Sequence, residues 1–218
     1  MRGKDALNLY VGLAGTCQFI RKSVLEEVGG WNEKCLAEDT ELSVRLVEKN
    51  YGIRYAPDVR TWEESPFSVG GLVAQRARWF RGFIEIGARF GKLITRPSFR
   101  RFDTEVTLFG TFVLMLCVVN YIVPLWGFAV PQTFWTIPIA QFTSVFTLTL
   151  LAVVGVALAT ASRPVRLRNV LWLPFIFVYW SFQSFIAVYA LLLVVFRRPK
   201  QWQKTEHTGL ISNAEVHA

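Results

Sequence analysis

The segment Val106–Val130 has the sequence VTLFGTFVLMLCVVNYIVPLWGFAV and contains no Asp, Glu, Lys, Arg or His. Two further segments, Phe134–Thr160 and Val170–Phe196, lack these residues as well. Each segment is longer than the ~20 residues that a helix needs to cross the hydrocarbon core of a bilayer. A helix in a soluble core is rarely apolar on every face over such a length. We therefore predict at least two membrane-spanning helices.

The charges of this 218-residue chain are concentrated in two basic bands. The formal net charge of +8 divides into −2 for residues 1–75, +7 for 76–101, −2 for 102–162, +7 for 163–204 and −2 for the last fourteen residues. Basic bands beside uncharged stretches are typical of a membrane protein whose basic side faces the cytoplasm. The arginines flank apolar spans and do not line a soluble face, which argues against a nucleic-acid partner.

Residues 1–62 are predicted to form a soluble α/β region. Strand-like runs occupy residues 9–13, 18–20 and 53–56. A helix is expected over Lys22–Val28, ended by the two glycines that follow it. Asp39 can cap a second helix, in which Glu41 and Arg45 form an i,i+4 pair.

The segment Gly70–Ile94 mixes long apolar and aromatic residues with four arginines. This composition favours a helix at the membrane interface, or two helices broken near Gly82 or Gly87. The three cysteines and two histidines show no ligand spacing, so we predict no metal site within the chain.

The charge pattern leaves the membrane topology open. Two crossings return the chain to the cytoplasm near Arg163, and a third would place the basic residues after Phe196 outside, against the positive-inside rule. Either the rule fails for this chain, or Val170–Phe196 is broken at Pro174 and near Gln183 into an interfacial and a re-entrant piece.

Two clusters could carry chemistry. The first, Glu38-Asp39, lies at a predicted helix N-terminus, where a carboxylate could act as a general base or simply cap the helix. In the second, Gln75, Arg78 and Trp79 share one helical turn. They could bind a phosphate and a sugar ring, or anchor the helix among lipid headgroups.

The order and spacing of these clusters resemble a known family. A co-linear series over residues 12–82 closely resembles the C-terminal half of the catalytic domain in membrane-embedded family 2 glycosyltransferases, which include cellulose, chitin and hyaluronan synthases. Its elements are Gly15-Thr16, Arg21-Lys22, Val28-Gly29-Gly30-Trp31, Glu38-Asp39, Leu42-Ser43-Val44-Arg45-Leu46, Tyr55-Ala56-Pro57, Glu63-Glu64-Ser65-Pro66 and Gln75-Arg76-Ala77-Arg78-Trp79. The resemblance favours the functional interpretation of both clusters.

The resemblance assigns a role to each matching residue. Asp39 matches the Asp of a T-E-D motif, the expected general base, and Glu38 is assigned to the same catalytic pair; Ala37 replaces the motif's Thr. The residues expected to bind substrate are Gly15, Thr16 and the Q-x-x-R-W residues Gln75, Arg78 and Trp79. The tail resembles a W-x-K-T-x-x-T-G segment, which implies possible substrate contacts by Trp202, Lys204 and Thr205.

The family's D-x-D motif, which holds Mg²⁺ or Mn²⁺ under the donor diphosphate, is absent from this sequence. We therefore expect a C-terminal portion of such an enzyme, inactive by itself, whose full-length form uses Mg²⁺ or Mn²⁺. The expected fold is a partial α/β nucleotide-sugar transferase domain of the A type, followed by interfacial and transmembrane helices. The expected regions are residues 1–67 (half of the catalytic domain), 68–104 (interfacial helices), 105–200 (two or three transmembrane helices) and 201–218 (polar tail).

The implied activity is inverting transfer of a sugar from a nucleotide-sugar donor to a polysaccharide or lipid-linked acceptor. Besides donor and acceptor, the expected partner is the lipid bilayer. The expected location is the cell membrane, with the catalytic portion in the cytoplasm. The alternative is a non-catalytic membrane-anchored partner or scaffold subunit that uses the same residues only for docking.

Overall fold

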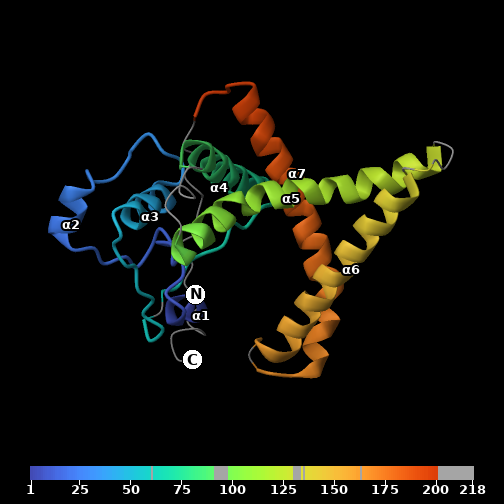
Figure 1. Ribbon diagram of the computed structural model, residues 1–218, viewed down its shortest axis with the longest axis horizontal. Helices are drawn as coiled ribbons and strands as arrows, with labels where there is room; N and C mark the ends of the chain where they lie inside the picture. Colours follow the sequence, from blue (N-terminus) through green and yellow to red (C-terminus); the bar gives the residue numbers. More distant parts are fainter. Residues whose placement is uncertain (60, 91–97, 130–133, 135, 163, 201–218) are drawn as a thin grey trace. The chain divides into compact units, whose positions relative to one another are not determined.

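In the computed structural model, residues 1–59, 61–90, 98–129, 134, 136–162 and 164–200 are described, and their regular secondary structure is helical (Figure 1). Short helices precede a pair of medium length, and three long apolar helices follow. The helices are α1 (Arg2–Ala6), α2 (Lys22–Glu27), α3 (Glu38–Glu48), α4 (Val69–Phe90), α5 (Phe99–Ala129), α6 (Thr136–Thr160), the 3₁₀-helix η2 (Leu167–Trp172) and α7 (Leu173–Val195).

The predicted α/β fold is wrong for the described residues, which contain no β-strand. A strand needs a neighbouring strand to take up its backbone hydrogen bonds, and none is present in this part of the chain. Other groups bind the backbone of the predicted first strand instead. The amide of Tyr10 donates to the Asp103 carboxylate at 3.0 Å, and the amide of Leu13 donates to the Ser43 hydroxyl at 2.8 Å.

The chain divides into two compact units, and the first comprises Met1–Phe109 together with the residues from Leu193 onward. Helix α3 is at the centre of this unit because it buries two faces. Val44 packs with Ile86 and Leu108 in one apolar cluster. Leu42 and Leu46, one turn apart, pack with Val28 and the extended segments in another. The predicted Glu41–Arg45 pair is confirmed, with a nitrogen-oxygen distance of 2.8 Å.

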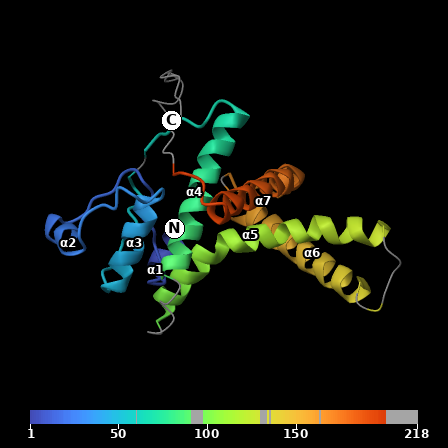
Figure 2. The same cartoon turned by 90° about the horizontal axis from the view of Figure 1, so that it is seen from above.

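Helix α4 lies beside α3, as Figures 1 and 2 both show, and it is unbroken from Val69 to Phe90. Of the two alternatives that the sequence left open, the structure therefore has the single helix and not the pair broken near Gly82 or Gly87. Gly82 instead allows a close helix contact: a Cβ atom added there would lie only 2.6 Å from the Cβ of Ala37. The absence of a side chain at Gly82 brings α4 against the residue immediately before α3.

The second unit, Gly110–Leu192, contains most of α5, all of α6 and η2, and most of α7. Three helical segments are long and apolar enough to cross a membrane: Phe99–Val123, Ile137–Thr160 and Leu167–Val195. Their large apolar side chains are widely exposed; Phe142, for example, is 72% exposed. Such a surface is unfavourable in water, which agrees with a membrane environment.

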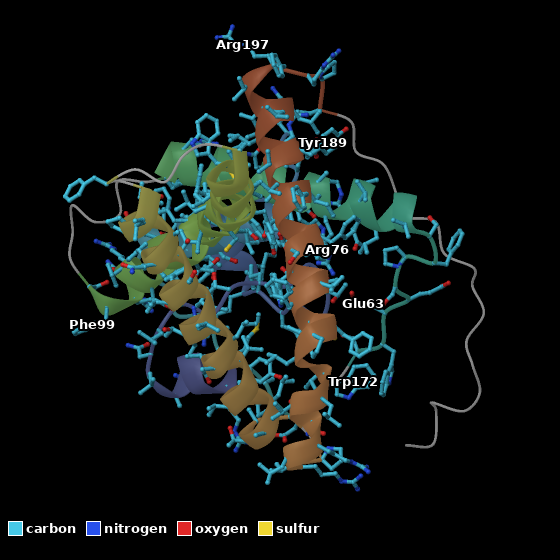
Figure 3. The ribbon with its side chains drawn as sticks, turned by 90° about the vertical axis from the view of Figure 1, so that its right-hand side faces the viewer. Glu63, Arg76, Phe99, Trp172, Tyr189 and Arg197 are labelled. Carbon is cyan, nitrogen blue, oxygen red and sulfur yellow. The ribbon has the colours of Figure 1, made fainter. Side chains whose placement is uncertain are left out.

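Helix α7 is also continuous from Leu173 to Val195, so the break of Val170–Phe196, one of the two alternatives that the charge pattern left open, is not found. Pro174 lies in its first turn, where the missing amide hydrogen costs little. The hydroxyls of Ser181 and Ser184 donate to carbonyls one turn earlier, at 2.7 and 2.9 Å, and so remain satisfied within the helix. Figure 3 labels Trp172 just before the helix starts and Arg197 just after it ends.

Candidate active site

The carboxylate of Asp39 is half-buried in the first turn of α3. The helix starts at Glu38, and its capping residue is Ala37, which makes no side-chain cap. The prediction that Asp39 caps the helix is therefore wrong. One carboxylate oxygen accepts the amide hydrogen of Thr40 at 2.6 Å. The other faces Gly15: a Cβ added to Gly15 would lie 3.3 Å from it. The structure thus brings Gly15, an expected substrate-binding residue, next to Asp39.

The surroundings of Asp39 suit a proton acceptor. Burial raises the pKa of the Asp39 carboxyl above its usual range, and the charge of neighbouring Glu38 raises the pKa further. The hydrogen bond from the Thr40 amide opposes this rise by stabilising the ionised form. A carboxylate with a raised pKa holds a proton more strongly than an exposed aspartate does, which a general base requires.

A buried hydroxyl fixes the backbone around this carboxylate. Ser43 is fully buried and donates to the Asp39 carbonyl at 2.7 Å while accepting the amide hydrogen of Leu13. The buried hydroxyl of Tyr10 also hydrogen-bonds Ser43, and burial raises the pKa of Tyr10 to about 12, so it stays protonated. These bonds hold residues 10–15 against the first turn of α3. Sequence reasoning placed Ser43 in a motif but missed this role, because the hydrogen bonds depend on the tertiary fold.

The Q-x-x-R-W residues lie on α4, the helix that packs against α3. Arg78 donates to the carbonyl of Leu36 at 3.2 Å, three residues before Asp39. Gln75 and Trp79 are partly buried on the same stretch of α4. The guanidinium of Arg76 lies 4.2 Å from the centre of the Trp79 ring, in a cation-π contact. Through this hydrogen bond, Arg78 of the Q-x-x-R-W cluster is joined to the backbone just before the Glu38-Asp39 cluster.

Thr16 lies at the edge of this region, and its hydroxyl donates to the carboxylate of Glu63. Glu63 belongs to the extended segment before α4, and Figure 3 labels it together with Arg76 of α4. Sequence reasoning placed Glu63 in a motif without giving it a partner. The predicted tail contacts Trp202, Lys204 and Thr205 lie outside the described residues.

The described part of the chain does not hold a metal cluster built from protein ligands alone. Within it, no three His, Cys, Asp or Glu side chains come together as ligands. Mg²⁺ is commonly held by one or two carboxylates together with substrate phosphates, so the ion expected from the resemblance stays a prediction.

Comparison with known proteins identifies the family. The family model described as "Glycosyl transferase family group 2" matches residues 3–197, which is most of the chain. The chain belongs to this family. The resemblance to family 2 glycosyltransferases is thereby confirmed, and the chain is part of a family of sugar-transferring enzymes. Its match extends from the Asp39 region through all three apolar helices.

Two relatives within the glycosyltransferases illustrate the match. The chain is 46% identical to "Probable glycosyltransferase YdaM" of Bacillus subtilis over 70 residues, 32% of this chain and 17% of that protein. It is 31% identical to "Poly-beta-1,6-N-acetyl-D-glucosamine synthase" of Staphylococcus aureus over 114 residues, 52% of this chain and 27% of that protein. The matches thus span only about a quarter of these relatives or less. No solved structure matches the chain.

Proposed function

We propose that this chain forms the acceptor side of an inverting, membrane-embedded glycosyltransferase, with Asp39 as the general base. One observation carries the proposal: the half-buried Asp39 carboxylate, whose pKa is raised, lies beside Gly15 and close in sequence to the Leu36 carbonyl that Arg78 of α4 binds. Sugar transfer from a diphosphate requires a base for the acceptor hydroxyl and positive charge for the leaving group.

In the proposed reaction, a hydroxyl of the acceptor attacks the anomeric carbon of the donor sugar from the face opposite the diphosphate. The bond from this carbon to the acceptor oxygen forms as the bond to the diphosphate oxygen breaks. The hydroxyl proton passes to Asp39, and the nucleoside diphosphate leaves with the bonding electrons. Arg78 would stabilise the negative charge of the leaving group, while Gln75 and Trp79 would hold the acceptor sugar.

The acceptor is proposed to be a polysaccharide or a lipid-linked glycan at the inner face of the cell membrane. Three apolar helices of sufficient length follow the site, and the Staphylococcus aureus relative is named as a polysaccharide synthase. The two basic bands favour a cytoplasmic location for the first unit. The nucleotide-sugar donor and any divalent cation would be bound with the help of residues other than those described.

A chimeric enzyme tests the proposal. This chain replaces the matched segment of the Staphylococcus aureus synthase, and release of nucleoside diphosphate and formation of polymer are measured in membranes with that enzyme's own donor. We expect both products to form together. A chimera that inserts into membranes at the level of the parent synthase but releases no diphosphate would contradict the proposal and favour the non-catalytic scaffold.

Replacing Glu38 by Gln separates the roles of the two acidic residues. The charge of Glu38 raises the pKa of Asp39, so removing it lowers that pKa. Asp39 then remains ionised at lower pH, and the acidic limb of the pH profile of kcat/KM moves to lower pH with activity retained. Glu33→Gln, at an exposed acid, is the matched control and should leave the profile unchanged. Complete loss of activity in Glu38→Gln would instead make Glu38 the base.

A further inference from the structure

A buried ion pair on α4 holds the chain segment that follows α7. Arg81 is only 6% exposed, and its Nε donates to Glu85 Oε1 at 3.1 Å. Its two terminal nitrogens donate to backbone carbonyls of this segment, to Pro199 at 3.1 Å and to Arg198 at 2.6 Å. A buried guanidinium is costly unless such acceptors match it, so this arrangement forms a built site.

The end of α7 is shaped to present these carbonyls. Arg197 has a φ of +49°, a left-handed conformation that costs a residue other than glycine about 1 kcal/mol. The amides of Arg197 and Arg198 donate to the carbonyls of Val194 and Leu193, both at 3.0 Å, which closes the last turn of the helix. The next residue, Pro199, cannot continue the helix.

A second ion pair fixes the same segment. The Nζ of Lys200 lies 2.6 Å from Glu85 Oε2, so Glu85 binds Arg81 with one oxygen and Lys200 with the other. One ion pair and two hydrogen bonds to backbone carbonyls therefore connect α4 with three consecutive residues after α7.

We infer that Arg81 and Glu85 form a docking site for the segment Arg198–Lys200, which holds the end of α7 on the same side of the membrane as α3 and α4. The inference takes from the proposed function only that the apolar helices are embedded in a bilayer. It does not depend on the reaction.

This docking limits the number of membrane crossings. The chain leaves the first unit after Phe109 and rejoins it at Leu193. A chain that returns to the side it left must cross an even number of times. Two of the three candidate helices therefore cross fully, and the third does not. The docking also places Arg197, Arg198 and Lys200 on the side of the first basic band, in agreement with the positive-inside rule.

Labelling of single cysteines from each side of sealed vesicles tests this inference. In the full chain, with Cys17, Cys35 and Cys117 replaced by Ser, an impermeant maleimide is applied to Arg198→Cys and to Lys22→Cys. Both positions are exposed, and Arg198→Cys retains the backbone carbonyl that Arg81 binds. We expect both cysteines to react from the same side. Reaction from opposite sides would overturn the inference.

A third reporter tests whether α5 is one of the crossing helices. Phe134→Cys replaces an exposed residue between α5 and α6. If it reacts from the side opposite to Lys22→Cys, α5 is one of the two crossing helices; if it reacts from the same side, α6 and α7 are the crossing pair. Both outcomes support an even number of crossings when Arg198→Cys and Lys22→Cys react from the same side.

Extraction of the chain by alkaline carbonate would instead contradict its membrane location, and with it the proposed function.

A substitution at Arg81 tests the docking itself. Arg81→Gln removes the guanidinium donors to Arg198 and Pro199, so hydrogen exchange of residues 193–200 should accelerate about tenfold, the equivalent of about 1.4 kcal/mol. Arg89→Gln, at an exposed arginine of the same helix, is the control and should leave exchange of this segment unchanged. Equal exchange in both variants would show that Arg81 does not hold the segment. The cysteine labelling does not depend on the stability of either variant.

Discussion

Replacing Asp39 by Asn is expected to lower kcat of the chimeric enzyme by about 10²–10⁴-fold, the usual contribution of a general base. The amide has nearly the same shape as the carboxyl group but cannot accept the hydroxyl proton. KM should change little, because the groups assigned to acceptor binding, Gln75 and Trp79, remain in place. The measurement is the rate of nucleoside diphosphate release at saturating donor.

Stability distinguishes loss of the base from loss of the fold. The pKa of Asp39 is raised in the folded protein, so ionisation of Asp39 lowers the free energy of unfolding. The stability is full at pH values below the pKa of the unfolded chain and falls as the pH rises through the pKa of the folded protein. Asn does not ionise, so Asp39→Asn should be at least as stable as the wild type near pH 7. Asp58→Asn, at an exposed aspartate, is the control and should keep full activity. Activity of Asp39→Asn equal to that of this control would disprove the assignment.

Replacing Gly82 by Ala is expected to destabilise the first unit by about 1–3 kcal/mol, the range for an overpacked core. The new methyl carbon would lie 2.6 Å from the Cβ of Ala37, closer than real Cβ contacts, and 3.0 Å from its backbone nitrogen, at the tight end of such contacts. The backbone nitrogen belongs to the residue before α3, so relief of the clash moves the first turn, which carries Asp39. We therefore expect lower activity together with a lower denaturation midpoint.

Gly70→Ala is the matched control on the same helix. A Cβ at Gly70 meets no atom within 4 Å, and alanine favours the helical conformation more than glycine does. This variant should be as stable as the wild type or slightly more stable, with unchanged activity. If Gly82→Ala behaved in the same way, the close contact between α3 and α4 would not be needed for the site.

The apolar helices and the core of α3 could be predicted from the sequence because their signals are local. An uncharged segment of sufficient length and the spacing of Leu42 and Leu46 each determine a helix or a buried face by themselves. The strands could not be predicted in this way. Residues 9–13 have the composition of a strand, but pairing depends on a second segment, and Ser43 and Asp103 bind their backbone instead.

The sequence predicted which residues form the candidate site, but not how these residues contact one another in the fold. The motif spacing singled out Asp39 and Arg78. The close packing of α4 on the residue before α3 depends instead on Gly82, which local sequence rules marked as a possible helix break. The contact of Gly15 with Asp39 likewise follows from the hydrogen bonds of Ser43, which join segments thirty residues apart.

The cation-π contact on α4 limits the side of the Trp79 indole on which an acceptor sugar could stack. Because Arg76 covers one side of the Trp79 indole, at most one side remains for an acceptor sugar to stack upon. The two faces of a pyranose differ in which hydroxyls they carry. In the proposed reaction, an acceptor sugar held by Trp79 would therefore stack on the side of the indole away from Arg76, with its less polar C–H face against the ring.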